Sequence, residues 1–285
     1  MRIGIVGASS MVGTRFRTRV SARHSVVGIG RGDGDELRLD LTSAYTPAAC
    51  RDPFDAIVHC AASFGGDDLE QARQNELTNA VGAVRVAQFA RDTQCKHLVY
   101  LSTLWALPEN ALHTSYGLSK RHAEELLEWA CHREGMCLTA LQPSQLYDEL
   151  GEARKHQPLL YHIIDCARGG KDFTLYGTKD PVRNYLFVDD LVRIIEAVLE
   201  NSIYGSFPIL HPESHRLTEI SAMAYQVFGT SGKLLRRAEM PDPPEYFYPP
   251  DTRLLERTRV WPQVNLRQGI ELIGRHIGAV PKSLS

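Results

Sequence analysis

The 285-residue sequence lacks several features that would assign it to a specialised class of protein. None of its six cysteines belongs to a Cys-x-x-Cys pair, so we expect reduced thiols, with neither a disulfide framework nor a metal site. No apolar run approaches the roughly 18 residues that a membrane span needs, and the apolar run at the N-terminus is too short for a signal peptide. These absences predict a cytoplasmic protein without a membrane partner.

The sequence also lacks an excess of charge of either sign. Its 32 basic and 34 acidic residues give a formal net charge of −2, which offers no electrostatic footprint for nucleic acid or an anionic membrane. An apolar content of 43% is ordinary for a globular protein, and the length suits one large domain or two closely joined ones. The expected partner is therefore a small molecule.

A turn that contains two glycines follows the first predicted strand. Residues 3–6 are apolar, Gly7 and Gly13 follow them, and a segment with helical periodicity comes next. Strand, glycine turn and helix is the context in which backbone N–H groups and the helix dipole bind a phosphate. Ser10 stands where a middle glycine would, and a tight turn without a ligand has the same pattern.

The second predicted strand, residues 26–31, ends without the carboxylate typical of NAD sites. Gly30 fills that position and Arg31 follows it. A small residue followed by a guanidinium group suits the 2′-phosphate of NADP, although a surface arginine at a strand end gives the same pattern. Asp40 comes at the next predicted strand end, where its carboxylate would lie near an adenine amine.

Tyr116 and Lys120 stand four residues apart at the start of a helix-forming segment. On a helix such a pair shares one face, and an ammonium beside a phenol favours the phenolate. We therefore expect a lowered pKa for Tyr116 and acid–base chemistry on a carbonyl or an alcohol. The pair alone favours a solvated helix that carries a chance tyrosine and lysine. Thr103 favours the catalytic interpretation, because a hydroxyl at a strand end faces the ligand crevice of an open α/β sheet.

The order of elements predicts an α/β fold. Helices are expected at residues 69–92, from residue 115 onward, at 191–199 and at 266–277, with short apolar strands between many of them. The buried strand 55–62 contains His59 and Cys60, which we interpret as core residues without a catalytic role. It closes on Ala61 and Ala62, whose small side chains would let a ribose or nicotinamide lie against the backbone.

The motifs in this order resemble the extended short-chain dehydrogenase/reductases, the NAD(P)-dependent sugar-nucleotide epimerase, dehydratase and reductase group. The resemblance covers nearly the whole chain and depends on Gly7-x5-Gly13, Asp40-Leu41, His59-Cys60-Ala61-Ala62, Asn79-Ala80-Val81-Gly82, Leu101-Ser102-Thr103, Tyr116-x3-Lys120, Gln142-Pro143-Ser144 and the run from Arg183 to Asp190. It implies a Rossmann-type doubly wound parallel sheet with a smaller, discontinuous C-terminal α/β subdomain that binds substrate. Residues 1–142 with about 183–200 would form the dinucleotide-binding domain, and about 143–182 with 201–285 the substrate-binding subdomain.

The resemblance also implies roles for individual residues. Thr103 would hydrogen-bond the substrate oxygen, Tyr116 would exchange its proton, and Lys120 would hold the ribose and lower the pKa of Tyr116. The residues expected at the cofactor are Gly7, Ser9, Ser10, Met11, Val12, Gly13, Arg31, Asp40, Leu41, Ala61, Ala62, Tyr116, Lys120, Pro143 and Ser144. The substrate would meet Thr103, Gln145 and Arg183, with Arg183 as a clamp on its diphosphate.

Two positions narrow the expected reaction. Leu104 and Trp105 follow Thr103 where the dehydratases of this group carry Asp-Glu, and Leu104 also replaces the cysteine used for 3,5-epimerisation. The leading hypothesis is an NADPH-dependent reductase of a nucleotide-linked 4-keto sugar. The alternative is an NAD-dependent nucleotide-sugar 4-epimerase, and a third candidate is a regulator that binds the dinucleotide without turnover. The resemblance further implies a homodimer formed through the helices at 69–92 and 115–134, with Leu126 and Trp129 as candidate contacts.

Overall fold

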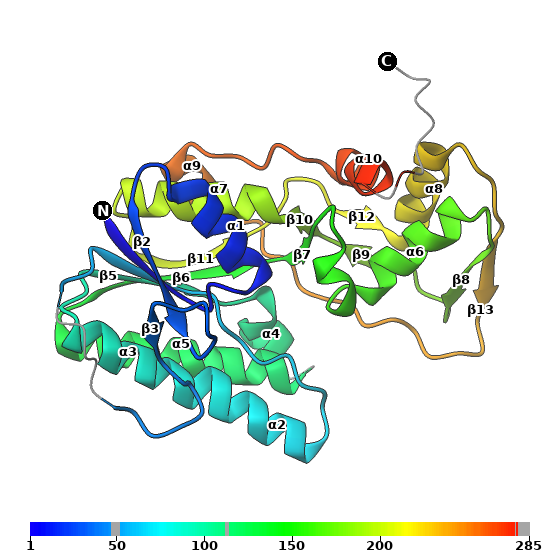
Figure 1. The fold of residues 1–285 in the computed structure, drawn as a ribbon. Helices are drawn as coiled ribbons and strands as arrows, with labels where there is room; N and C mark the ends of the chain where they lie inside the picture. The colour runs from blue at the N-terminus through cyan, green and yellow to red at the C-terminus, as the bar shows by residue number, and fades with distance from the viewer. Residues whose placement is uncertain (47–51, 112–113, 277, 279–285) are drawn as a thin grey trace. The chain divides into compact units, whose positions relative to one another are not determined.

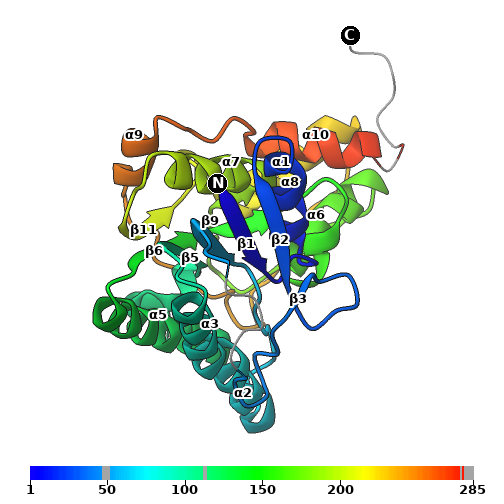
Figure 2. The same ribbon diagram turned by 60° about the vertical axis from the view of Figure 1, so that its left-hand side comes forward.

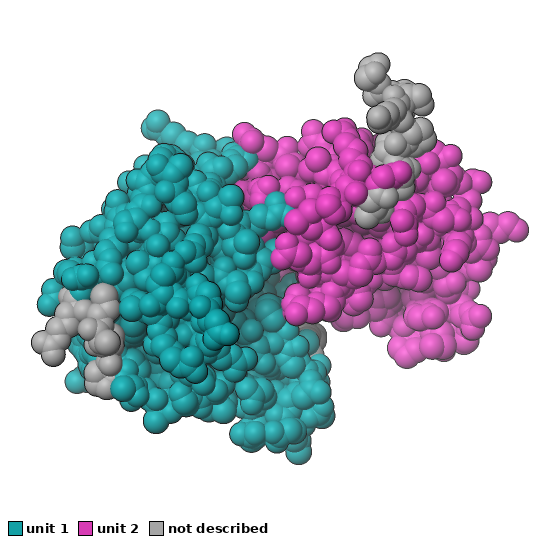
Figure 3. Space-filling view, in the orientation of Figure 1, with its two compact units in different colours: residues 1–143, 192–209, 249–261 teal, residues 144–191, 210–248, 262–285 magenta. Residues whose placement is uncertain are grey.

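The structure is a computed structural model that describes residues 1–46, 52–111, 114–276 and 278 (Figure 1). It contains two compact units, which Figure 3 colours separately. Unit 1 comprises Met1–Pro143, Val192–Ile209 and Pro249–Trp261, and unit 2 comprises Ser144–Leu191, Leu210–Tyr248 and Pro262–Ser285.

Unit 1 is built on a seven-stranded sheet in the order β11-β6-β5-β4-β1-β2-β3, with every neighbouring pair parallel. Its strands are β1 (Arg2–Val6), β2 (Ser25–Gly30), β3 (Leu37–Arg38), β4 (Ala56–His59), β5 (His97–Leu101), β6 (Cys137–Pro143) and β11 (Gly205–Ile209). Every residue of β4 and β5 is buried, as expected for central strands of a parallel sheet that is covered on both faces. The predicted α/β fold with a Rossmann-type sheet is confirmed. Strand β11 extends this sheet beyond residue 200, and the domain boundaries drawn from the sequence stay a prediction.

Helices cover both faces of this sheet. They are α1 (Met11–Val20), α2 (Leu69–Asn75), α3 (Gly82–Asp92), α4 (Pro108–Ala111), α5 (Ser115–Glu134), α7 (Val188–Glu200), which enters unit 1 at Val192, and α9 (Arg253–Thr258). Figure 2 shows α3 and α5 along one face of the sheet and α1 and α7 along the other. The core between the sheet and the α3–α5 pair contains Phe54, Ile57, Val86, Phe89 and Leu127, each at most 2% exposed.

A π-helical segment, Glu76–Val81, joins α2 to α3 within the helical stretch that the sequence predicts for residues 69–92. Such segments insert an extra residue into a helical turn and occur frequently at functional sites. Here the segment carries Asn79, which is 1% exposed. Its side chain hydrogen-bonds the backbone of Ser63, in the loop after β4.

The described part of unit 2 contains three small two-stranded sheets and three main helices. The strand pairs are β7 (Gln145–Tyr147) with β10 (Tyr185–Phe187), β9 (Val182–Arg183) with β12 (His215–Arg216), and β8 (Phe173–Tyr176) with β13 (Leu234–Arg237). The helices are α6 (Pro158–Arg168), α8 (Leu217–Phe228) and α10 (Leu266–His276), and α8 packs against both of the others. The smaller C-terminal subdomain expected from the sequence therefore has its own sheets and helices.

The five cysteines among the described residues, Cys60, Cys95, Cys131, Cys137 and Cys166, have free thiols, and Cys50 lies outside that part of the chain. No described helix combines the length and the apolar character needed to cross a bilayer.

Candidate functional site

The turn between β1 and α1 forms a tight cradle of backbone. Gly7 has a φ of +83°, and a Cβ at this position would lie 2.7 Å from the backbone nitrogen of Ala61. A Cβ on Gly13 would lie 2.3 Å from the carbonyl oxygen of Gly7. Both positions therefore require glycine. Ser10 caps α1, since its Oγ accepts from the Gly13 N–H (3.1 Å) and donates to the Gly7 carbonyl (2.8 Å).

This cradle fits the pyrophosphate of a dinucleotide. The start of α1 presents backbone N–H groups, and its first turn contains no acidic residue that would repel a phosphate. Ser9 is exposed, Met11 is half-buried and Val12 is buried beneath the turn. Ala61, whose N–H donates to the Val6 carbonyl (3.1 Å), and its half-buried neighbour Ala62 line the same edge of the sheet with small side chains.

Basic and acidic side chains lie near the carboxyl ends of β2 and β3. Arg31 and Arg38 are exposed, and the Arg38 guanidinium donates to the Arg31 carbonyl (3.5 Å). Asp35 belongs to none of the sequence motifs, and its carboxylate accepts from the Gly32 N–H (2.8 Å). A Cβ on Gly30 would lie 2.5 Å from that carboxylate, so Asp35 occupies the space that the glycine leaves open.

Asp40 and Leu41 follow β3. The Asp40 carboxylate accepts from the backbone N–H and the hydroxyl of Thr42, both at 2.8 Å. These hydrogen bonds, together with the charges of Arg31 and Arg38, lower the pKa of Asp40. Leu41 is buried, and its carbonyl accepts from Arg85. Asp40 therefore stays ionised at the strand end, where the sequence predicts an adenine contact.

The Thr103 hydroxyl lies close enough to the Tyr116 phenol to act on its pKa. Thr103 ends the segment after β5 and begins a short 3-10 turn, Leu104–Ala106, while Tyr116 lies in the first turn of α5. Gly117 permits their approach, because a Cβ there would lie 2.5 Å from the Trp105 carbonyl oxygen. The structure thus brings together the hydroxyl and the phenol that the sequence singles out.

Lys120 lies one helical turn after Tyr116 and is 1% exposed. Its Nζ donates to the Leu101 carbonyl (2.7 Å) and lies 4.2 Å from the centre of the Tyr100 ring. Burial lowers the pKa of Lys120 to about 7, although the nearby acidic groups of Glu124 and Cys60 oppose the shift. Lys120 is therefore close to losing its charge at neutral pH.

The prediction of a lowered pKa for Tyr116 is wrong for this structure. Burial raises the pKa of Tyr116, and the nearby Thr103 hydroxyl only partly opposes the rise. The ammonium of Lys120 is directed at the Leu101 carbonyl and the Tyr100 ring, so desolvation outweighs any stabilisation of the phenolate. Tyr116 is accordingly a protonated phenol, able to donate a proton.

A half-buried carboxylate outside the sequence motifs supports this site. Glu124, one turn beyond Lys120 on α5, accepts from Ser102 Oγ and from Gln142 Nε2 (2.7 Å). Burial raises the pKa of Glu124, while those hydrogen bonds and the charge of Lys120 lower it. The spacing Lys120-x3-Glu124 was the only available signal in the sequence, and it is a common spacing on helices.

His59 and Cys60 lie beneath the same site, and the structure assigns them to the core. His59 is 1% exposed, its ring lies 5.3 Å from that of Tyr100, and burial lowers its pKa to about 3. Burial raises the pKa of the Cys60 thiol to about 12. Both groups are therefore uncharged at neutral pH.

Comparison with known proteins identifies the relatives of this chain. The sequence profile of the NAD dependent epimerase/dehydratase family matches residues 3–207. The chain belongs to this family. Its members use a nicotinamide dinucleotide, which agrees with the cradle at Gly7 and Gly13 and with the Tyr116–Lys120 pair on α5.

Two relatives in the family differ in how much of the chain they match. A dTDP-4-dehydro-6-deoxy-D-allose reductase from Streptomyces bikiniensis is 24% identical over 318 residues, which cover 95% of this chain and 94% of the relative. A UDP-glucuronic acid decarboxylase 1 from Xenopus tropicalis is 22% identical and covers 68% of this chain and 49% of its own length.

Solved structures of two epimerases share the fold. The UDP-glucose 4-epimerase of Thermus thermophilus, in complex with NAD, is 19% identical with a TM-score of 0.76, over 98% of this chain and 100% of that chain. The UDP-glucuronic acid 4-epimerase of Bacillus cereus, also with NAD, is 17% identical with a TM-score of 0.79, over 100% and 99%. At these identities the likeness concerns the fold alone.

The other predicted ligand residues of this epimerase/dehydratase-family chain lie at the end of β6 and in unit 2. Pro143 ends β6, and Ser144 is buried. Gln145 accepts from the Tyr248 hydroxyl (3.1 Å). Arg183 is 2% exposed, donates to the carbonyls of Val182 (2.8 Å) and Pro244 (2.9 Å) and lies 4.9 Å from the centre of the Tyr246 ring. Its predicted role at a diphosphate stays a prediction.

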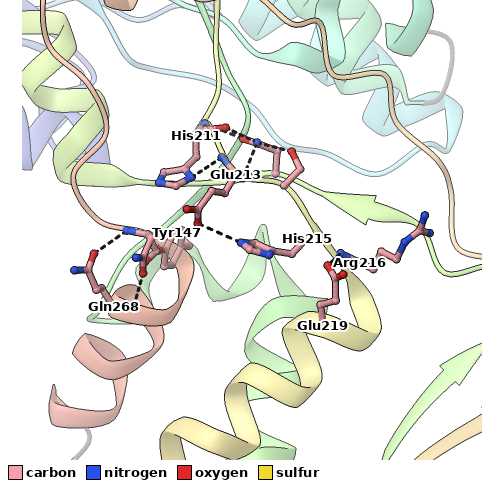
Figure 4. A network of polar contacts seen from close by, with 10 residues as sticks. Tyr147, His211, Glu213, His215, Arg216, Glu219 and Gln268 are labelled. Carbon is pink, nitrogen blue, oxygen red and sulfur yellow. Dashed lines mark hydrogen bonds and ion pairs between the residues drawn. The ribbon is translucent and has the colours of Figure 1, made fainter.

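A network of polar contacts fixes the segment beside Arg183 (Figure 4). Asn184 donates from Nδ2 to the carbonyls of His211 (2.8 Å) and Glu213 (3.2 Å), and its Oδ1 accepts from the His211 N–H (3.0 Å). The Glu213 N–H donates to Nδ1 of His211 (3.0 Å), and the Glu213 carboxylate pairs with His215 (3.7 Å). These contacts hold β12 in its antiparallel register with β9, in which the backbone of His215 lies opposite that of Arg183.

The burial of Lys120 predicts a pH dependence of stability. Its pKa rises from about 7 in the folded protein to its usual 10.5 on unfolding, so between these values the unfolded chain binds the extra proton. The free energy of unfolding should therefore increase with pH across this window, and Lys120→Met should remove that increase. Denaturant titrations at pH 7, 8 and 9 measure it. Lys96→Met, at a side chain that is 74% exposed, is the matched control. Parallel pH profiles for Lys120→Met and the wild type would contradict the prediction.

Proposed function

We propose that the protein is an NADPH-dependent reductase of the 4-keto group of a nucleotide-linked sugar. The observation that carries the proposal is the Tyr116 phenol beside the Thr103 hydroxyl, with Lys120 buried one helical turn away. A protonated phenol beside a hydroxyl suits a carbonyl substrate, because both groups can donate to the same oxygen.

The reaction requires one proton and one hydride. The substrate oxygen accepts hydrogen bonds from Thr103 and Tyr116, which polarise the carbonyl. Reduced nicotinamide, when bound, supplies the hydride to the carbon. Tyr116 gives its phenolic proton to the oxygen as negative charge develops there. Lys120, whose pKa of about 7 lets it exchange a proton near neutral pH, can help to restore the proton of Tyr116.

The turn after Thr103 supports reduction over dehydration. Leu104 is buried, and the backbone carbonyl of Trp105 lies close to Gly117 of α5. Elimination of water needs an acid and a base beside the reacting carbons, and neither residue can provide them. The full-length match to a 4-keto-sugar reductase supports the same choice.

A nucleotide-sugar 4-epimerase is the second candidate. A 4-epimerase would also need Tyr116 to act as a base, which its raised pKa opposes, but solved 4-epimerases share this fold with TM-scores of 0.76 and 0.79. Such an enzyme would retain NAD through its cycle. A dinucleotide-sensing regulator is disfavoured, since sensing needs neither Tyr116 nor Lys120.

Replacing the phenol tests catalysis directly. Tyr116→Phe should lower kcat for reduction of a nucleotide-linked 4-keto sugar by about 10²–10⁴-fold, because the proton donor is lost. Dinucleotide binding, measured by fluorescence titration, should stay within about twofold. Tyr204→Phe, at a ring that is 44% exposed, is the control and should keep full activity. Undiminished turnover by Tyr116→Phe would exclude this mechanism.

The choice of NADPH depends on charges at the ends of β2 and β3. Arg31 and Arg38 favour a 2′-phosphate, whereas the Asp35 carboxylate against Gly30 opposes one. Arg31→Ala should weaken NADPH binding by about tenfold and NADH binding less, and Asp35→Ala should strengthen NADPH binding. Thermal shifts with each dinucleotide measure both effects. Tight binding of NAD with no response to NADPH would instead favour the epimerase.

We also propose a homodimer formed through the face that α2, the π-helical segment and α5 share. Leu69 (91% exposed), Val81 (44%) and Trp129 (58%) leave apolar surface on these elements. Leu126 is half-buried and contributes less.

Sedimentation velocity at micromolar concentration tests the dimer. The wild type should sediment as a dimer, and Trp129→Asp should shift it to a monomer because the carboxylate would be buried without a partner. Leu150→Asp, at another exposed apolar residue (46%), should leave the dimer intact. A wild-type monomer would contradict the proposal.

A further inference from the structure

An aromatic ring covers one face of the catalytic phenol. The rings of Phe64 and Tyr116 are stacked, with centroids 4.5 Å apart and an interplanar angle of 24°. Phe64 nevertheless remains 51% exposed. Part of the ring is thus available to a ligand that reaches Tyr116.

Asn79 fixes the residue before Phe64. Its Oδ1 accepts from the Ser63 N–H (2.8 Å), and its Nδ2 donates to the Ser63 carbonyl (3.0 Å) and to Ser119 Oγ (2.9 Å). Ser119 Oγ in turn donates to the carbonyl of Tyr116 (2.9 Å). One side chain of the π-helical segment therefore links the loop to the backbone of Tyr116.

Asn75 fixes the residue after Phe64 in the same manner. Its Oδ1 accepts from the Gly65 N–H (2.9 Å), and its Nδ2 donates to the Gly65 carbonyl (3.4 Å) and to Ser115 Oγ (2.9 Å). Asn75 is fully buried, and a Cβ on Gly65 would approach its Oδ1 to 3.0 Å.

The two asparagines hold Phe64 in place on both sides. Each makes paired hydrogen bonds with a flanking backbone residue and ties that residue to a serine adjacent to Tyr116 or Lys120. Since the backbone is fixed at Ser63 and Gly65, the Cα of Phe64 is held beside Tyr116, and the ring can leave Tyr116 only by a change of side-chain rotamer. Phe64 is therefore a built wall of the site.

We propose that Phe64 determines substrate specificity, by selecting carbonyl substrates whose reacting carbon is flanked by apolar substituents. The inference rests on the proposed function, in which the reacting carbon is C4 of a nucleotide-linked sugar. Groups on the adjacent carbons lie within a few bonds of the oxygen that Tyr116 protonates. A methyl group there, as in a 6-deoxy sugar, gains contact with the ring.

A hydroxyl at the same place is disfavoured for a physical reason. The phenyl ring offers no hydrogen-bond donor or conventional acceptor, so a hydroxyl pressed against it loses water without a replacement. An apolar wall of this kind discriminates against an added hydroxyl by about 10–100-fold. The predicted preference is for a 4-keto-6-deoxy sugar over its 6-hydroxy counterpart.

The experiment compares kcat/KM for two nucleotide-linked 4-keto sugars that differ only at C6, one with a methyl and one with a hydroxymethyl group. The wild type should prefer the deoxy compound by about 10–100-fold. Phe64→Asn, which can hydrogen-bond the hydroxyl, should reduce the ratio to within about threefold. Phe64→Leu should keep most of the preference, because the wall stays apolar. Trp261→Leu, at a ring 43% exposed elsewhere in unit 1, is the control.

The outcomes separate the two proposals. A wild-type protein that reduces neither compound, while it binds the dinucleotide, overturns the proposed function and the inference with it. Equal kcat/KM for the two compounds in the wild type, or the same ratio in Phe64→Asn as in the wild type, overturns the role of Phe64 alone. Fluorescence titration with the dinucleotide verifies that each variant is folded.

Discussion

The buried ammonium of Lys120 is the constraint on which the rest of the site depends. A cation that is only 1% exposed needs compensation, and it finds the Leu101 carbonyl at 2.7 Å and the Tyr100 ring at 4.2 Å. Both partners belong to β5, so the charge ties α5 to the carboxyl end of a central strand. That link also brings Tyr116, one turn earlier on α5, to the edge where Thr103 leaves β5.

The contacts of Lys120 compensate only partly for the burial of its charge, and this has a chemical consequence. Glu124 contributes negative charge, yet it shares its oxygens with Ser102 and Gln142, and burial raises its own pKa. The pKa of Lys120 therefore falls to about 7. An ordinary surface lysine would keep its proton at neutral pH, whereas this one can release and regain it. The same desolvation raises the pKa of Tyr116, so the pair combines a firmly protonated phenol with a readily deprotonated amine.

The sequence predicts the elements better than the contacts between them. Periodicity and glycine placement locate the sheet, the Gly7–Gly13 turn and the α5 pair, because each depends on residues close together in the chain. The hydrogen bonds that support the site join residues far apart in the sequence. Asn75 and Asn79 each bind a serine 40 positions later, and Glu124 binds Gln142, 18 positions later. A polar residue at helical spacing is equally typical of a solvated face, so only the fold distinguishes these roles. The predicted direction for the pKa of Tyr116 failed for a related reason, since spacing says nothing of burial.

The end of β2 shows why a motif can be interpreted correctly and still leave the chemistry open. Gly30 removes the side chain that would place a carboxylate at the ribose, which favours a 2′-phosphate. The missing side chain of Gly30 also leaves space. The carboxylate of Asp35 fills this space, 2.5 Å from the position that a Cβ on Gly30 would take. Asp35 is anchored by the Gly32 N–H, within its own loop, whereas a strand-end aspartate is fixed by the sheet. A carboxylate on a loop can turn away from an arriving 2′-phosphate at small cost, so a glycine at position 30 permits either dinucleotide. The preference between NAD and NADP then depends on how firmly the loop holds Asp35 against the attraction of Arg31 and Arg38.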